Sequence, residues 1–275
     1  MRYPIPELPE VATIAAQLNE VMPLKISKYE LSHVSNSIIH TKMDKLRGKV
    51  ILEVQRKGKM LNFLLSDNRH LLSHLGMTGG WRISKTKVLE KHTHLQFTGL
   101  HLGEKVYVAY VDPRRFGHMY LYNKEETIKK LNELGADLKS AEFTYPYFKA
   151  SLLKYPKRLI KVSLLDQKLF AGTGNYIANE ICARAKVLPN RIVESLSEPE
   201  LKKLYKHVFT VIDGATKTGG TTFAGGYADT TGSKGNGVGH LVVFYQKVCQ
   251  MCKKTEVVKT VLGQRGTYHC PKCQR

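Results

Sequence analysis

The stretch Pro6-Glu7-Leu8-Pro9-Glu10-Val11 marks the start of the first regular element of the chain. Proline needs no N–H partner in a first helical turn, and a carboxylate there complements the helix dipole. Apolar residues then recur at spacings of three and four, namely Val11, Ile14, Ala15, Leu18 and Met22. This periodicity predicts an amphipathic helix with an acidic first turn.

The pattern changes after this helix. Residues 25–123 contain short runs of β-forming residues, such as 49–54 and 105–111, which are broken by Gly, Asp and Asn. Runs of this kind predict a sandwich or barrel. Residues 146–219 have helical spacing, interrupted by a turn at 171–175. The following stretch, through residue 239, is rich in Gly, Thr and Ser, which predicts a mobile loop.

The chain has 275 residues, enough for two modest domains, and a formal net charge of +20. A charge of this size favours a polyanionic partner, with nucleic acid the first candidate, over a solvated surface or an anionic membrane. No apolar run approaches the roughly 20 residues of a spanning helix, and no signal peptide opens the chain. We therefore expect a soluble cytoplasmic protein that does not bind membranes.

Four of the five cysteines form two C-x-x-C pairs, Cys249 with Cys252 and Cys270 with Cys273, separated by 17 residues. This spacing is typical of a four-thiolate zinc ribbon and predicts one structural ion, because no position is left for a catalytic water. Two disulfides or free thiols are the alternative. Strands at 255–261 and 267–269 with a turn at 263–266 would place Arg265 at the tip of the hairpin.

Six collinear motifs resemble formamidopyrimidine-DNA glycosylase. They are Pro6–Val11, Gly58-Lys59, 74–77 (HLGM), 112–117 (DPRRFG), 165–175 and the terminal ribbon. The resemblance implies an α+β protein with DNA in a cleft between its domains. The expected parts are a β-sandwich flanked by helices (1–135), a linker (136–145), a helix-two-turns-helix domain (146–240) with a lesion-capping loop at about 221–239, and a zinc ribbon (241–275).

The N-terminal motif suits one kind of chemistry. An α-amino group has a pKa of about 7.7–8.0, against about 10.4 for lysine, so an N-terminal proline is a ready nucleophile at neutral pH. Its attack on the sugar C1′ would expel a damaged base and leave an iminium ion that serves as an electron sink. By resemblance, Pro6 is this nucleophile and Glu7 its proton-transfer partner, while Lys59 and Arg265 act in the elimination of the flanking phosphates. An ordinary helix start is the alternative for Pro6 and Glu7.

The resemblance also implies how the duplex is opened and held. Met77, Arg114 and Phe116 match residues that fill the gap left by an extruded nucleotide, which side chains of these types can do. Core packing is the alternative for Met77 and Phe116, although the neighbouring glycines favour exposed loops. The expected contacts to the DNA backbone are His92, Arg114, Lys157, Lys161 and Asn175.

Two features depart from the family pattern. Five residues precede Pro6, which would make its nitrogen an amide, so we expect the active chain to begin at an initiator read at Ile5. Residues 223–227 of the capping loop lack a charged side chain.

The leading hypothesis is a glycosylase and lyase for oxidised purines in double-stranded DNA, acting as a monomer and associated with a bacterial nucleoid. The alternatives are an oxidised-pyrimidine enzyme of the endonuclease VIII type and a catalytically silent binder of damaged DNA.

Overall fold

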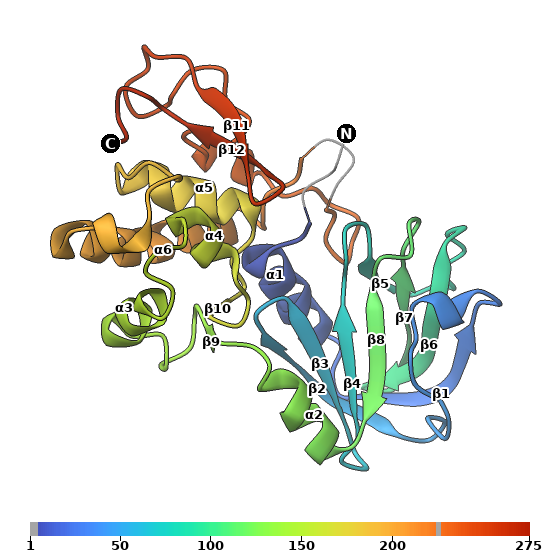
Figure 1. Cartoon of the computed structure of the whole chain (residues 1–275). Helices are drawn as coiled ribbons and strands as arrows, with labels where there is room; N and C mark the ends of the chain where they lie inside the picture. The colour runs from blue at the N-terminus through green and yellow to red at the C-terminus, as the bar shows by residue number, and fades with distance from the viewer. Residues whose placement is uncertain (1–4, 224–226) are drawn as a thin grey trace. The chain divides into compact units, whose positions relative to one another are not determined.

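The computed structural model describes residues 5–223 and 227–275. The chain divides into two compact units (Figure 1). The first contains residues up to 133 together with 219–236, and the second contains 134–218 together with 237–275. A large antiparallel sheet in one unit and helices in the other confirm the α+β class that the sequence predicts.

The first unit begins with α1 (Leu8–Asn19), whose buried face carries the predicted apolar residues from Val11 to Leu18. Eight strands follow, with η1 (Ser35–Ser37) after the first and α2 (Lys124–Leu131) after the last. The strands are β1 (Leu24–Leu31), β2 (Val50–Lys57), β3 (Met60–Leu65), β4 (His70–His74), β5 (Gly80–Ser84), β6 (Thr93–His101), β7 (Glu104–Val111) and β8 (His118–Tyr122). Their order in the sheet is β5-β7-β6-β1-β2-β3-β4-β8, and neighbouring strands are antiparallel.

The eight-stranded sheet folds over on itself. Trp81 in β5, at one edge, contacts Phe63 in β3 with ring centroids 4.7 Å apart, although four strands separate these two in the sheet order. The Trp81 indole N–H also donates to the Ser73 hydroxyl of β4 at 3.2 Å. Both rings are fully buried in a core that α1 joins through Ile14 and Leu18. Side chains from two layers of the sheet therefore share one interior, as in a sandwich.

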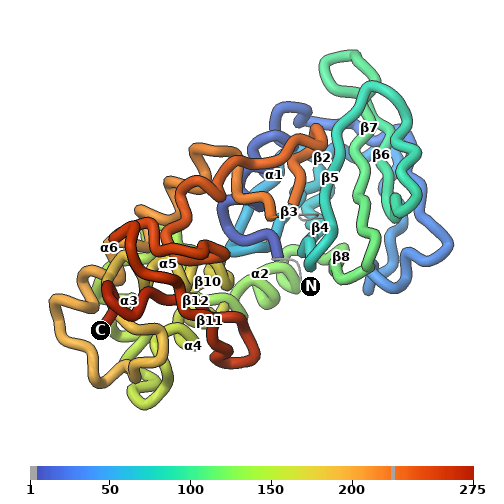
Figure 2. Tube along the Cα trace, turned by 90° about the horizontal axis from the view of Figure 1, so that it is seen from above, coloured from blue at the N-terminus to red at the C-terminus, as the bar shows by residue number. Residues whose placement is uncertain are grey.

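The segment 219–236 belongs to the first unit, whereas the sequence prediction assigned it to the helical domain. The Gln17 side-chain oxygen accepts the backbone N–H of Thr230 at 3.0 Å, and the Ile83 N–H donates to the Thr230 carbonyl at 3.1 Å. Figure 2 shows this orange segment running beside α1 and β5. Contacts this distant in sequence leave no local signal, which explains the difference.

The second unit is mainly helical. Its elements are β9 (Ala136–Asp137), α3 (Tyr145–Leu153), α4 (Ile160–Leu165), β10 (Phe170–Ala171), α5 (Asn175–Arg184), η2 (Val193–Ser195), α6 (Glu198–Lys217), η3 (Gly237–His240), β11 (Val258–Leu262) and β12 (Arg265–His269). Residues 136–145, predicted as a linker, instead supply β9, which pairs in parallel with β10. Among the residues that the structure describes, no helix is long and apolar enough to cross a bilayer.

The terminal hairpin is tighter than the sequence suggested. β11 and β12 pair up to Leu262 and Arg265, so Gly263 and Gln264 alone form the turn. Their φ angles of 53° and 61° are the left-handed pair that a type I′ turn requires. Arg265 is therefore the first residue of β12 and not a turn residue.

Candidate functional site

The N-terminal motif lies at the buried start of α1. Pro6 is buried and Glu7 is 1% exposed, with Glu7 at the N-cap of the helix. The Glu7 backbone N–H donates to Glu10 Oε2 at 2.8 Å, which is one half of a capping box. The helix start thus holds the two residues predicted to carry the chemistry in one fixed position.

Glu10 does more than complement the helix dipole. Its other oxygen, Oε1, accepts the backbone N–H of Thr221 at 2.6 Å, 211 residues along the chain. Gly220 next to it has φ +91°, and a Cβ there would lie 3.0 Å from Glu10 Cγ. One buried carboxylate therefore binds both the N-terminal motif and the entry to the predicted capping loop. The capping-box spacing signals its first role, whereas no local pattern signals the second.

Lys59 lies in the two-residue turn between β2 and β3, where Gly58 has φ +58°. Its side chain is half-buried. Burial is the main reason why the pKa of His74 falls to about 4, and the nearby positive charge of Lys59 adds to it. His74 is therefore neutral at neutral pH and adds no repulsion beside Lys59.

Two loops of the first unit are locked together by Asp112, which is fully buried. Its carboxylate accepts the Thr78 hydroxyl at 2.6 Å, the Gly117 N–H at 2.8 Å and the Arg114 N–H at 3.2 Å. A Cβ on Gly76 would lie 2.2 Å from the Phe116 carbonyl oxygen, so only glycine allows this approach. Sequence reasoning assigned no role to Asp112, although it belongs to the quoted motif.

These loops carry the three residues predicted to fill the duplex. Phe116 is 45% exposed, Arg114 is exposed and Met77 is half-buried. The Arg114 guanidinium lies over the Phe116 ring, 4.8 Å from its centroid. The structure therefore favours exposed loop positions over core packing, most clearly for Phe116. His92 is half-buried, and its carbonyl accepts the Asp112 N–H at 3.0 Å.

In the second unit, several side chains converge on the carbonyl of Gly266, directly after Arg265. Asn175, the first residue of α5, donates its amide N–H to this oxygen at 3.0 Å, and Lys161 donates to it at 3.0 Å. Asn179 accepts the Tyr268 N–H at 2.7 Å. The helices therefore fix the strand that begins with Arg265, whose own side chain is exposed.

Lys161 differs from the other predicted contacts to the DNA backbone. Its side chain is fully buried, and its ammonium group also donates to the Thr267 hydroxyl at 2.7 Å. The buried ammonium group therefore helps to hold the hairpin, and its expected contact with a DNA phosphate stays a prediction. Lys157, four residues earlier, is exposed.

The four cysteines of the ribbon gather at one point. The ligand atoms of Cys249, Cys252, Cys270 and Cys273 lie within 4.8 Å of one another. Four sulfurs bound at about 2.3 Å around a tetrahedral ion are about 3.8 Å apart, close to the 3.9 Å between Cys252 Sγ and Cys270 Sγ. The cluster can therefore hold one metal ion.

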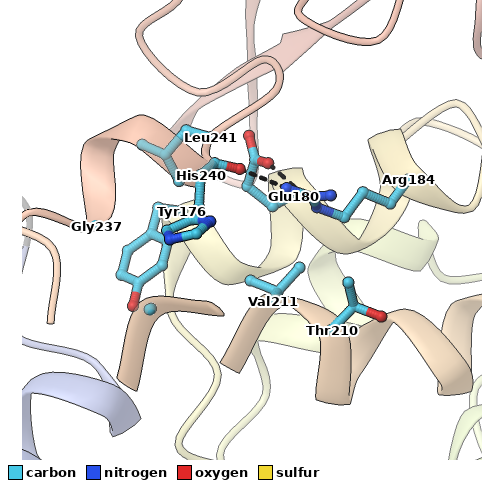
Figure 3. A pocket seen from close by; sticks show the side chains of 9 residues that line it. Tyr176, Glu180, Arg184, Thr210, Val211, Gly237, His240 and Leu241 are labelled. Carbon is cyan, nitrogen blue, oxygen red and sulfur yellow. Dashed lines mark hydrogen bonds and ion pairs between the residues drawn. The ribbon is translucent and has the colours of Figure 1, made fainter. Parts of the chain in front are cut away.

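A buried carboxylate also fixes the segment that precedes the ribbon. Glu180 in α5 accepts the N–H groups of Val242, Val243 and Phe244 at 2.8–2.9 Å. Arg184 lies 3.7 Å from Glu180 and donates to the His240 carbonyl, beside a cavity of about 80 Å³ (Figure 3). This arrangement ties η3 and the chain after it to α5.

The first unit is an antiparallel sheet that opens on a buried acidic helix start, and the second is a helical unit that ends in a four-thiol ribbon. The chain matches the Formamidopyrimidine-DNA glycosylase N-terminal domain over residues 5–119 and the Formamidopyrimidine-DNA glycosylase H2TH domain over residues 134–225. It therefore belongs to the formamidopyrimidine-DNA glycosylase family, as the six motifs indicated.

Individual relatives agree along nearly the whole chain. The formamidopyrimidine-DNA glycosylase of Listeria monocytogenes serovar 1/2a is 36% identical over 280 residues, covering 98% of this chain and 100% of the relative. The Lactococcus lactis Fpg in complex with abasic-site DNA has a TM-score of 0.86 and 30% identity, covering 98% and 99%. MutM in complex with DNA containing carbocyclic 8-oxo-G has the same TM-score and identity, covering 98% and 100%.

Proposed function

We propose that the protein is a base-excision repair glycosylase that removes 8-oxoguanine and formamidopyrimidines from double-stranded DNA and then cleaves the strand at the abasic site. The observation that carries the proposal is the Pro6-Glu7 pair, held at the buried start of α1 by Glu10. The solved relatives contain abasic-site and 8-oxo-G DNA, and the charge of +20 suits a polyanionic partner.

The reaction requires a free secondary amine at Pro6, so the proposed active form begins at this residue. The proline nitrogen attacks C1′, the bond from C1′ to the base breaks, and the base leaves with the bonding electrons and takes up a proton. Glu7 protonates the sugar ring oxygen, which opens the ring. The resulting iminium ion cannot become neutral by losing a proton from nitrogen, so it withdraws electrons while the flanking phosphates are eliminated.

The remaining predicted residues take supporting roles in the proposal. Lys59 assists the elimination from the first unit and Arg265 from the second, while Asn175 at the N-terminus of α5 binds a phosphate. Met77, Arg114 and Phe116 fill the space of the extruded nucleotide, and His92 and Lys157 contact the DNA backbone. Zinc is the proposed ion of the four-thiol cluster. We further propose that the protein acts as a monomer in the bacterial cytoplasm.

Borohydride trapping tests the chemistry directly. A chain that begins at Pro6 is incubated with a duplex containing one 8-oxoguanine, and sodium borohydride is added to reduce any iminium link between protein and DNA. We expect a covalent complex at Pro6 from this chain and none at Pro6 from the 275-residue chain that keeps residues 1–5, because the Pro6 nitrogen is then an amide without a lone pair for attack. Glu7→Gln should slow base release by about 10²–10⁴-fold, the usual contribution of a positioned proton donor.

The same experiment separates the alternatives. Binding without trapping by the Pro6-initiated chain would contradict the glycosylase proposal and favour a silent binder of damaged DNA. Faster trapping on a duplex with an oxidised pyrimidine than on one with 8-oxoguanine would contradict the proposed substrate class. Mass spectrometry of the protein expressed from its own gene checks which residue begins the mature chain.

A further inference from the structure

Two histidines far apart in the sequence meet on the surface of the first unit. His40 follows η1, and His118 is the first residue of β8. Nε2 of His40 lies 2.8 Å from Nδ1 of His118, and both side chains are exposed. None of the residues proposed for base excision belongs to this pair.

The backbone and a neighbouring ring hold the pair in place. The His40 N–H donates to the Met119 carbonyl at 3.0 Å, so the two segments are joined next to the imidazoles. The His40 ring lies 5.2 Å from the Tyr120 ring, which in turn stacks on Tyr122 at 5.3 Å. The backbone therefore places the two imidazoles next to each other.

The surroundings of His118 favour its neutral form. Partial burial and then the nearby His40 ring lower the pKa of His118; Asp112 opposes them, and Lys130 adds a further, smaller lowering. A neutral imidazole has one nitrogen that can accept a hydrogen bond or bind a metal ion.

We propose that His40 and His118 together bind one divalent transition-metal ion, with Cu²⁺ or Ni²⁺ preferred over Zn²⁺. Imidazole suits these ions, and Cu²⁺ has the highest affinity of the series for a given site. With metal–nitrogen bonds of about 2.0–2.1 Å, cis ligands at a right angle are about 2.8–3.0 Å apart, whereas tetrahedral ligands are about 3.3–3.4 Å apart. The two rings are hydrogen-bonded at 2.8 Å, so their nitrogens already lie as close together as cis ligands of one ion.

Binding requires only local changes. The proton on the hydrogen-bonded nitrogen moves to the other nitrogen of its ring, so both facing nitrogens have a free lone pair and no proton is released. The rings tilt so that both lone pairs point at the ion, which exposed side chains allow. Water completes the coordination. The four-thiol cluster is a separate site with softer ligands.

Copper titration of the full-length protein, with its cysteine site first loaded with zinc, tests the proposal. Isothermal titration calorimetry should show one Cu²⁺ equivalent, and electron paramagnetic resonance should show a tetragonal signal with nitrogen coupling. His40→Ala and His118→Ala should each weaken Cu²⁺ binding at least tenfold. His33→Ala removes another exposed histidine of the same unit and should leave Cu²⁺ affinity unchanged.

A second measurement does not rely on variants. Sub-stoichiometric Cu²⁺ should broaden the imidazole NMR signals of His40 and His118 in the unaltered protein before those of other histidines. Unchanged Cu²⁺ affinity in His40→Ala, equal loss in His33→Ala, or broadening spread evenly over the histidines would overturn the proposal.

Discussion

The buried Lys161 gives the sharpest test of how the second unit is held together. We consider Lys161→Met, which keeps the length and most of the volume of the side chain but removes the ammonium group. The variant loses hydrogen bonds to the Gly266 carbonyl at 3.0 Å and to the Thr267 hydroxyl at 2.7 Å. Hydrogen bonds from charged donors contribute about 1.5–3 kcal/mol each.

The net effect is smaller than that sum. Asn175 still donates to the Gly266 carbonyl, and removing the charge also removes the cost of burying it. We therefore expect the hairpin to lose about 2 kcal/mol of stability against local opening, which corresponds to about 30-fold faster amide exchange. Hydrogen-exchange mass spectrometry on a peptide that contains Gly266 and Thr267 measures this change.

DNA binding separates a buried lysine from a phosphate ligand. Each phosphate contact contributes about −0.9 to the slope of log K against log salt concentration. Lys157→Met, the exposed counterpart, should reduce the magnitude of this slope by about 0.9, whereas Lys161→Met should leave it unchanged. A structural role for Lys161 would be refuted if Lys161→Met reduced the magnitude of the salt slope as much as Lys157→Met does. It would also be refuted if the amide groups of the Lys161→Met hairpin exchanged no faster than those of the unaltered protein.

Three further predictions concern other parts of the molecule. Gly76→Ala places a Cβ 2.2 Å from the Phe116 carbonyl oxygen and should weaken binding to an abasic-site duplex at least tenfold, as measured by fluorescence anisotropy. Gly103→Ala should leave this affinity unchanged, because Gly103 also has a positive φ but has open space around it. Removing the metal with a chelator should speed amide exchange throughout 258–269, and Cys252→Ser should do so without chelator; an unaffected hairpin would contradict a structural ion. The pKa of His74 falls from 6.5 to about 4 on folding, so the unfolded chain binds this proton more readily, and the free energy of unfolding in urea should decrease as pH falls from about 6.5 to 4. His74→Gln should show a smaller decrease. An equal decrease in the variant would contradict the assignment to His74.

Local patterns were sufficient for much of the fold. The apolar spacing from Val11 to Leu18 predicted α1, and the run of β-forming residues at 105–111 predicted β7, because these patterns depend on a single element. The C-x-x-C pairs predicted the thiol cluster for the same reason, since each pair is brought together by its own turn. The order of the six motifs was enough to identify the family.

The sequence by itself therefore determined the elements, the family and the candidate chemistry. Only the tertiary structure decided that Lys161 is enclosed, that Glu10 binds Thr221 across 211 residues, and that His40 meets His118. Each of these depends on which distant segments pack against one another. The amino acids involved are common surface types, and their burial and partners arise only when the chain has folded.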